Sequence, residues 1–347
     1  MTVAVEQVML ASPEDTAALE QLIRRWGADR IAKLALLYRV EGEYEDGSRE
    51  RSRAAVHDLL SRHGLDRRAE MVTTVGCEGL STPFGIVLAE LGGAAPAAER
   101  AASTERRLAI GLARGNPPSE LVIDKASFAA DVAGLVGTAI KHGGMIATDV
   151  VTVIVNTPQP STGDKAERGR KTRAVAALGA GIAIGEIKPD SVTDAALLTR
   201  PDLYTPRVQT FAGPTVKQIE VIVLGNRTGI GGHFTACSTV TDNLMDLRPI
   251  KRMLVAASMT LDADGELREP ERVAALLLKS SVPPGGDIKG RRTMLFAPGL
   301  PVEKHVRAAQ SGLVAGLLGT SCALNTYDPV HQCPVGGSAV CALVRQT

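Results

Sequence analysis

The chain is short of aromatic side chains and of any excess of one charge. Aromatic residues make up 3% of the 347 positions, so side chains on which nucleic-acid bases stack are scarce. The chain has 39 Lys and Arg against 38 Asp and Glu, a net charge of +1, which draws it neither to nucleic acid nor to an anionic membrane. We therefore expect a small-molecule partner, and neither nucleic acid nor a membrane.

Long apolar runs, a leader pattern and paired cysteines are lacking as well. No apolar run approaches the roughly 20 residues of a membrane-spanning helix, and the N-terminus does not combine a basic start with an apolar segment. The five cysteines are an odd number without a CxxC pair, which favours a reducing compartment over a disulfide framework or structural zinc. Hydrophobic residues, at 44%, suffice for a large core. We expect a cytoplasmic globular protein.

What the chain does have is one sequence pattern that occurs three times. Helix-start signals at Ser12, Ser127 and Thr241 each precede an apolar stripe with helical spacing. The first stripe consists of Leu19, Leu22, Ile23 and Trp26. Taken alone, such stripes are typical of any helical core.

A short apolar run follows each of these helices and ends on a polar residue. The three runs are KLALLYRVEG, VVTVIVNTPQ and AALLLKSSVP. Each predicts a buried strand that delivers one side chain at its C-terminal edge, namely Arg39, Asn156 and Lys279.

An arginine then opens a helix rich in small residues in each repeat. These are Arg49, Arg173 and Arg307, and twelve residues after them stand Ser61, Gly185 and Gly319 respectively. Because the three arginines recur in register behind the same kind of strand, we expect them to converge.

Each repeat closes with an irregular turn and a strand. The pairs are TTVGCEGLSTP before RLAIGLA, TFAGPT before IEVIVLG, and NTYDPVHQCPVGG before SAVCALV. Glycine and proline in such turns let backbone N–H groups face a ligand, here around Gly76, Ala212 and Tyr327. A tight hairpin explains any single turn equally well, but not the threefold recurrence.

The predicted fold is α+β, with three similar units around one central site. The units span residues 1–104, 105–238 and 239–347, and their joints fall near Gly92 to Thr104 and Gly225 to His233.

Several segments, in this order, resemble the ring-opening amidohydrolases, the family of cyanuric acid hydrolase and barbiturase. They are DTAALEQLI, Glu78-Gly79 in VGCEGLSTP, AVAALGAGIAI after Arg173, RRTML and HQCPVGGSAV, of which the last resembles the family's HQGP-GGGP segment most specifically. The resemblance implies three alike units about a pseudo-threefold axis, each giving a lysine, an arginine and a serine to a central pocket. It also implies hydrolysis of a small cyclic imide, pyrimidine or triazine, and a homo-oligomer, a tetramer in the family.

The chain keeps the family's arginines but departs at the other positions. By the resemblance, Arg49, Arg173 and Arg307 would each hold a ring carbonyl through planar guanidinium donors. The lysine positions carry Arg39, Asn156 and Lys279, and the serine positions carry Thr74, Phe211 and Thr326. Since arginine has a pKa of roughly 12 or higher, it cannot act as a base, and neither can asparagine.

The family's catalytic pair belongs to the middle unit, where this chain has Asn156 and Phe211. The unit that retains an amine opposite a hydroxyl is the third, with Lys279 and Thr326. Burial and neighbouring arginines would lower the pKa of Lys279, so that it activates Thr326 as in serine–lysine hydrolases. Backbone N–H groups of Tyr327 and Asp328 would hold the oxyanion.

Other readings stay open at this point. The scaffold suits a ring-forming biosynthetic enzyme or a binding protein without a nucleophile, and Lys279 alone is as typical of a solvated strand end. Cys77 and Cys333 are alternative nucleophiles, although a buried small-residue role fits them better, and His331 fits a structural role. Phe211 would form an apolar wall for a substituent, unless it points into the core.

We expect no cofactor for the reaction itself. Family members hold a magnesium ion beside the C-terminal loop, where this chain offers carbonyl oxygens at Gln332, Cys333 and Pro334, in the stretch that ends at Gly336. The segment after Lys279 supplies no acidic partner before Asp287.

Overall fold

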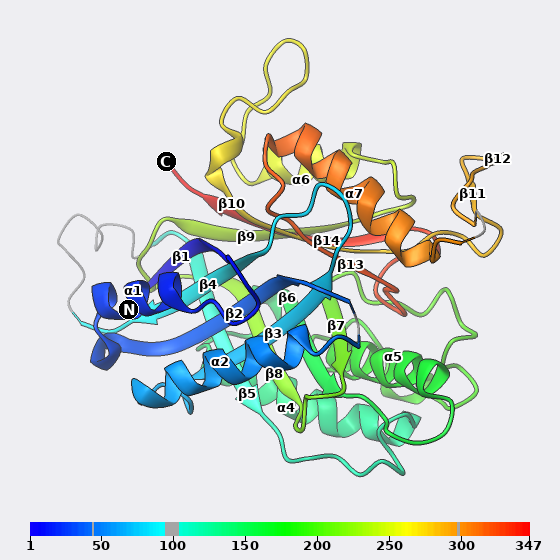
Figure 1. Cartoon of the computed structure of the whole chain (residues 1–347), viewed down its shortest axis with the longest axis horizontal. Coiled ribbons are helices and arrows are strands. Elements are labelled where there is room, and N and C mark those ends of the chain that lie inside the picture. Colours follow the sequence, from blue (N-terminus) through cyan, green and yellow to red (C-terminus); the bar gives the residue numbers. More distant parts are fainter. Residues whose placement is uncertain (44, 94–103, 297–298) are drawn as a thin grey trace.

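Three four-stranded sheets of one topology form the framework of the molecule (Figure 1). The computed structural model describes residues 1–43, 45–93, 104–296 and 299–347. The sheet orders are β1-β4-β2-β3, β5-β8-β6-β7 and β9-β14-β10-β13, so in each the first strand lies at one edge and the third at the other. The second and third strands of each unit are parallel, whereas the other pairs are antiparallel.

The first unit contains β1 (Thr2–Met9), α1 (Ala17–Trp26), η1 (Ala28–Arg30), β2 (Ile31–Glu41), α2 (Ser48–Arg62), β3 (Ala69–Gly76) and β4 (Phe84–Leu91). The second contains β5 (Arg107–Arg114), η2 (Ala126–Phe128), α4 (Ala129–His142), η3 (Ala147–Asp149), β6 (Val150–Pro158), α5 (Lys165–Ala183), η4 (Pro189–Ser191), β7 (Val208–Gly213) and β8 (Glu220–Arg227). The third contains β9 (Phe234–Thr241), α6 (Arg248–Ala256), η5 (Pro270–Arg272), β10 (Val273–Ser280), β11 (Asp287–Ile288), β12 (Arg291–Arg292), α7 (Val302–Leu318), β13 (Leu324–Tyr327) and β14 (Ser338–Arg345).

The three apolar runs with polar ends form β2, β6 and β10, as predicted. The strand that closes the first unit, however, is FGIVLAEL (β4), and the prediction of RLAIGLA for this place was wrong. RLAIGLAR forms β5, which pairs with β8 and begins the second unit. Both runs are apolar, so only long-range pairing distinguishes them.

Two of the three helix-start signals, at Ser12 and Thr241, were placed too early, whereas Ser127 lies in η2 directly ahead of α4. Asp15 accepts the N–H groups of Ala11 and Ala17 at 2.9 and 3.0 Å, so the segment from Ser12 to Asp15 is a turn ahead of α1. Thr241 still belongs to β9, which delays α6. The first predicted stripe is nevertheless buried in full at Leu19, Leu22, Ile23 and Trp26.

The arginine-bearing helices differ in where they begin. Arg49 is the second residue of α2, whereas α5 starts well before Arg173, so the expectation of an arginine at every helix start was wrong. Gly185 and Gly319 follow the ends of α5 and α7 with φ of 77° and 66°, a left-handed conformation that glycine adopts without strain.

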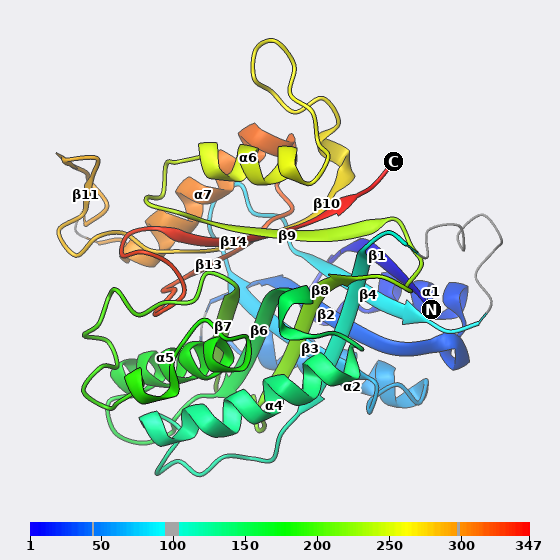
Figure 2. The same ribbon diagram turned by 180° about the vertical axis from the view of Figure 1, so that it is seen from behind.

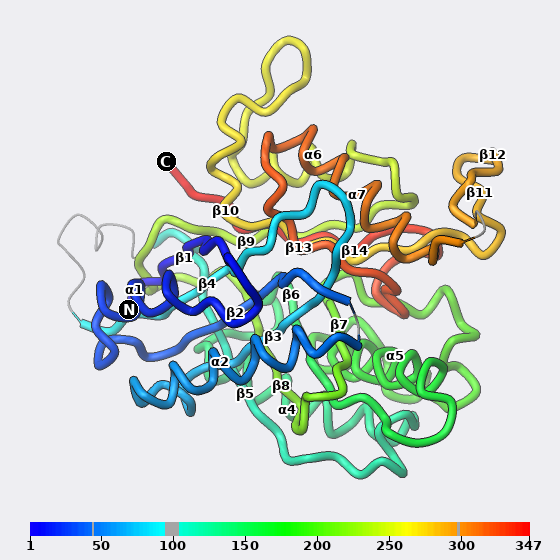
Figure 3. Tube along the Cα trace, in the orientation of Figure 1, coloured from blue at the N-terminus to red at the C-terminus, as the bar shows by residue number. Residues whose placement is uncertain are grey.

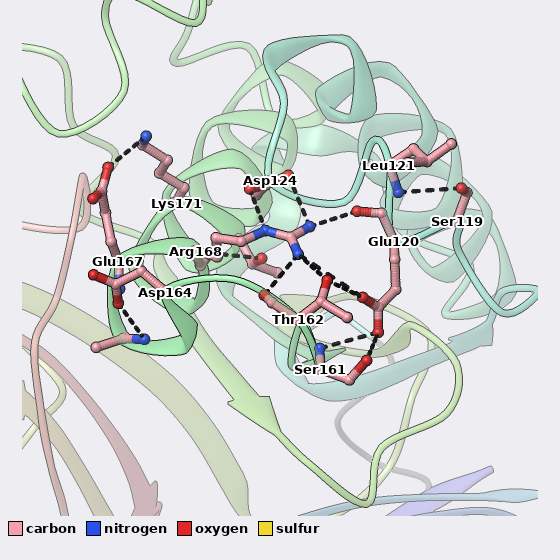
Figure 4. A network of polar contacts seen from close by, with 12 residues as sticks. Ser119, Glu120, Leu121, Asp124, Ser161, Thr162, Asp164, Glu167, Arg168 and Lys171 are labelled. Atoms are coloured by element: carbon pink, nitrogen blue, oxygen red, sulfur yellow. Dashed lines mark hydrogen bonds and ion pairs between the residues drawn. The ribbon is translucent and has the colours of Figure 1, made fainter.

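The N-terminal turn of α5 is fixed by one arginine (Figure 4). Arg168 Nε donates to Asp124 Oδ2 at 2.8 Å and its NH1 donates to Thr162 O at 2.9 Å. Asp164 caps the helix by accepting the N–H groups of Ala166 and Glu167 at 3.0 Å each. Because these contacts fix where α5 begins, they also fix where Arg173 points.

Helices cover the outer faces of the sheets, and the inner faces meet (Figure 2). The largest core cluster combines residues of all three units, for example Phe84 of β4, Ile154 of β6 and Leu277 of β10. Smaller clusters lie beneath the helices of the first and third units. The units therefore share one core at the centre.

The described strands place the sheets within residues 2–91, 107–227 and 234–345. The predicted boundary at residue 238 falls inside β9, and most of the predicted joint at residues 92–104 lies outside the described residues. The boundaries themselves stay predictions. The tube in Figure 3 shows the short β11–β12 hairpin projecting from the third unit. In the described part of the chain, no helix has the length and apolarity to span a membrane.

Candidate functional site

The strand-end residues and the turn residues predicted to face them are register partners in all three sheets. Arg39 pairs with Thr74 across β2 and β3, Asn156 with Phe211 across β6 and β7, and Lys279 with Thr326 across β10 and β13. Partners in a parallel pair present their side chains on one face. All six are at most 8% exposed, and they lie at the same end of equivalent strands.

Each predicted arginine reaches the turn of the next unit. Arg307 NH1 donates to Val75 O at 3.2 Å, so the third unit contacts the first. Arg173 of the second unit pairs with Asp328 of the third. A methyl group built on Gly213 would lie 3.2 Å from Arg49 NH1, which places the first unit's guanidinium against the second unit's turn. The three arginines therefore link the units in a cycle, whereas their convergence on one ligand stays a prediction.

The first unit's position is a buried ion-pair cluster. Arg39 pairs with Glu78, which also lies 2.5 Å from Arg307 NH2. Burial lowers the pKa of Arg39 to about 10, although Glu78 opposes the shift. Arg39 therefore stays protonated at neutral pH and cannot serve as a base.

The strand-end residue of the second unit is neutral, and its side chain has a fixed orientation. Asn156 Nδ2 donates to Glu220 Oε2 at 2.7 Å, and Glu220 Oε1 lies 2.5 Å from Arg53 NH2 of the first unit. A carboxylate only accepts hydrogen bonds, so it fixes which end of the Asn156 amide is the nitrogen. The amide oxygen is then the end left for a ligand N–H.

The third unit carries the titratable amine. Lys279 is 2% exposed, which contradicts a solvated strand end, and its Nζ lies 4.6 Å from the centroid of the Phe211 ring. Burial, with help from Arg173, lowers the pKa of Lys279 to about 7, while Asp328 opposes the shift. The Lys279 amine can therefore lose its proton near neutral pH, and Phe211 faces this amine besides contributing to the core.

The hydroxyls of Thr326 and Thr74 are held in equivalent ways. Thr326 Oγ1 donates to Leu278 O at 3.3 Å, and Thr74 Oγ1 donates to Tyr38 O at 3.1 Å. Each acceptor is the residue before the unit's strand-end side chain. A rotation about the Thr326 side chain is therefore needed before its proton can pass to Lys279.

Two of the predicted chemical roles do not fit the structure. The backbone N–H of Asp328 donates to Ser280 O at 3.1 Å, so it is not available as an oxyanion donor. Cys77 is exposed, not buried, and its thiol donates to Glu43 Oε1 at 3.0 Å. This bond raises the pKa of Cys77, and burial raises that of Cys333, so neither is a ready thiolate.

The C-terminal loop is docked on the second unit. His331 O accepts the N–H of Thr205 at 2.9 Å, and the His331 ring contacts the carbonyl of Leu203, which agrees with a structural role. Gln332 Oε1 accepts the N–H of Thr210 at 3.0 Å, and its Nε2 donates to Thr210 Oγ1 at 2.9 Å. Thr210 precedes Phe211, so the loop supports that wall of the site.

The residues present fit a magnesium ion poorly. Of the carbonyl oxygens that the C-terminal loop offers, that of Pro334 accepts the N–H of Gly337 at 2.9 Å, and the nearby carboxylate of Asp328 is paired with Arg170 and Arg173. Among the described residues, no group of three or more His, Cys, Asp or Glu side chains is placed to hold a metal ion. We derive no step through magnesium, and the implied ion stays a prediction.

Sequence reasoning missed the carboxylates of the site. Glu220 stands opposite Asn156 on β8, and Asp328 stands two residues after Thr326. The signal for Asp328 was present, since the corresponding positions after Thr74 and Phe211 are Gly76 and Gly213. An acidic residue where the other two turns have glycine indicates that the third turn differs from them in chemistry.

Comparison with known proteins agrees with this geometry. Residues 4–345 match the family model described as amidohydrolase ring-opening protein. A cyclic amide hydrolase of Azorhizobium caulinodans is 27% identical, covering 99% of this chain and all of the relative. A cyanuric acid amidohydrolase of Pseudonocardia dioxanivorans is 30% identical, covering 96% of each chain. A solved cyanuric acid hydrolase, described as an innovation by structural concatenation, superposes with a TM-score of 0.88 at 23% identity, covering 99% of each chain.

The three repeated units and their shared site define an enzyme that hydrolyses C–N bonds of cyclic amides. The chain belongs to the ring-opening amidohydrolase family. In this chain the middle unit has neither an amine nor a hydroxyl at the paired positions, which carry Asn156 and Phe211.

Proposed function

We propose that this enzyme opens an unsymmetrical cyclic amide with Lys279 and Thr326 of the third unit. The observation that carries the proposal is the buried Lys279 amine, held in register with Thr326 and with its pKa lowered to about 7. A base poised near working pH is the condition for general base catalysis.

The step balances with these two side chains and one water. Neutral Lys279 takes the proton of Thr326, and the alkoxide attacks a ring carbonyl to form a tetrahedral intermediate. The C–N bond breaks as the Lys279 ammonium returns the proton to the ring nitrogen, which leaves a threonine ester. Water, deprotonated by Lys279, then attacks the ester, and the Lys279 ammonium returns that proton to Thr326 as the ester C–O bond breaks and frees the ring-opened acid.

The surroundings favour a ring without threefold symmetry. The three strand-end positions hold a cation, an amide and a titratable amine, so the sides of the ring meet different chemistry. The Phe211 wall would stabilise an apolar ring substituent by roughly 1–3 kcal/mol through burial. Relatives named for cyanuric acid support a triazine ring as the starting class of substrate.

Mass spectrometry of the product tests the proposal. The enzyme is incubated with cyanuric acid, barbituric acid and N-alkylated derivatives of each, with Lys279→Met as the matched control. We expect one substituted ring to gain one water faster than cyanuric acid does; a triazine product then also loses carbon dioxide from the carbamic acid formed, so both masses are followed. A product lighter by one water would indicate ring formation, and binding without turnover would indicate a binding protein; either result overturns the proposal.

A further inference from the structure

A carboxylate stands in the third turn where the other two turns have glycine. Asp328 lies two residues beyond Thr326, as Gly76 and Gly213 lie two residues beyond Thr74 and Phe211. Asp328 adopts a φ of 64°, which is uncommon for a residue with a side chain but tolerated by aspartate. Its N–H is bound to Ser280 O, so the strained conformation is held from the backbone.

The Asp328 side chain is ionised and only partly used. Its Oδ2 pairs with Arg173 NH2 and, at 3.1 Å, with Arg170 Nε. Burial opposes ionisation of Asp328, but the two arginines outweigh it and lower its pKa. Within the part of the chain that the structure describes, both ion pairs fall on Oδ2, which leaves Oδ1 as an acceptor.

Asp328 also faces open space. Its side chain is 17% exposed and lines a cavity of about 180 Å³ together with Arg170, Tyr327 and Cys333. Asp328 follows Thr326 by two residues and pairs with Arg173, which places its carboxylate beside the groups that we assign to the site. A ligand attacked at Thr326 would therefore extend towards Asp328.

This arrangement changes one subsite from a hydrogen-bond donor to a hydrogen-bond acceptor. In a site built for ring carbonyls, a guanidinium offers N–H donors to each oxygen. Here Asp328 forms an ion pair with Arg173 and presents its Oδ1 as a hydrogen-bond acceptor instead. A ring carbonyl opposite a carboxylate would place two acceptors together, whereas an amino group would donate to it.

We propose that Asp328 selects a cyclic amide in which an amino-substituted ring carbon takes the place of one carbonyl. The inference rests on the proposed function for its reaction but concerns recognition, so binding tests it separately. The amino group would donate to Asp328 Oδ1, while the remaining carbonyls would face the arginine donors and Thr326.

Calorimetric titration with two matched triazines tests this assignment. The probes are cyanuric acid and ammelide, in which one amino group replaces one oxygen. We expect the wild type to bind ammelide at least about tenfold more tightly, the scale of one hydrogen bond to a charged group. Asp328→Gly, which restores the residue type of the other two turns, and Asp328→Asn should both lose this preference. Asp202→Asn, which removes an exposed aspartate paired with Arg200 nearby, should keep it.

Two results would overturn the assignment. One is tighter binding of cyanuric acid than of ammelide by the wild type. The other is an unchanged ammelide preference in Asp328→Asn, a variant that removes the charge without introducing glycine. Turnover is recorded in parallel. If the wild type prefers ammelide but opens neither ring, the hydrolytic proposal fails while the role of Asp328 in recognition stands.

Discussion

At the scale of single residues, the paired arginines of the site differ from the one side chain that can exchange a proton. Arg39, Arg173 and Arg307 are each neutralised by a carboxylate, whereas Lys279 contacts an aromatic ring and is held by burial at a pKa of about 7. The same pattern of polar strand ends thus yields two side chains that cannot act as a base at neutral pH and one amine that can exchange a proton.

Replacing Thr326 with valine tests its role as nucleophile. The change keeps the β-branched shape but removes the hydroxyl, so turnover should fall by at least about 100-fold with little loss of folding stability. Because paired catalytic groups fail together, the double variant with Lys279→Met should be little worse than either single variant. A multiplicative loss in the double variant would show that the two side chains act separately, and near-normal turnover of Thr326→Val would point to an activated water.

The pKa of Lys279 also predicts how stability depends on pH. In the unfolded chain a lysine has a pKa of about 10.4, above the folded value of about 7. Between these values the unfolded state binds more protons, so the free energy of unfolding should rise with pH in this window relative to that of Lys279→Met. Urea denaturation of both proteins from neutral to alkaline pH measures this difference. A difference that stays constant would contradict the lowered pKa.

The residue scale is also where the sequence was most and least informative. The repeated strand ends located Arg39, Asn156 and Lys279, and the family resemblance supplied the residues that are their register partners in all three sheets. Glu220 was missed because its role arises from a contact with Asn156 that sequence spacing does not encode. Asp328 was marked by the glycines at the corresponding positions of the other two turns, but its pairing with Arg173 was not.

At the scale of elements, the turn after β3 is held by a buried carboxylate. Glu78 pairs with Arg39 of β2 and Arg307 of α7, and therefore joins two units. Replacing Glu78 with glutamine leaves Arg39 buried without its counter-ion, which should lower the free energy of unfolding by about 3 kcal/mol. Glu14→Gln is the control, because its ion pair with Arg51 is largely exposed.

Chemical denaturation measures this effect, and equal stability of the Glu78→Gln and Glu14→Gln variants would contradict it.

Element boundaries were harder to predict than element types. The helix signals at Ser12 and Thr241 belong to a turn and to a strand, since the same residue types serve all three purposes.

At the scale of the whole molecule, the repeats cannot be independent domains. The inner faces of all three sheets share one apolar core, and arginines cross from each unit to the next. The repeat pattern in the sequence predicted the threefold plan, but not which of two apolar runs closes the first unit, because that depends on pairing between β4 and β1.

A shared core predicts one cooperative unfolding transition. Trp26, the one tryptophan of the chain, lies buried in the first unit's outer core and reports on that unit by fluorescence. Its thermal transition should coincide with that of far-UV circular dichroism, which reports on all units. An earlier or later fluorescence transition would show that the first unit unfolds alone.

The central claim, that the chemistry has moved to the third unit, is tested most directly by the pH–rate profile of Lys279→Met. For the wild type, kcat/KM should rise with pH and level off above about 7, as the Lys279 amine becomes neutral. Methionine keeps the approximate length of the stem but removes the amine, so the variant should lose at least about 100-fold in turnover and the rising limb with it. Near-normal turnover with the limb retained would contradict the claim.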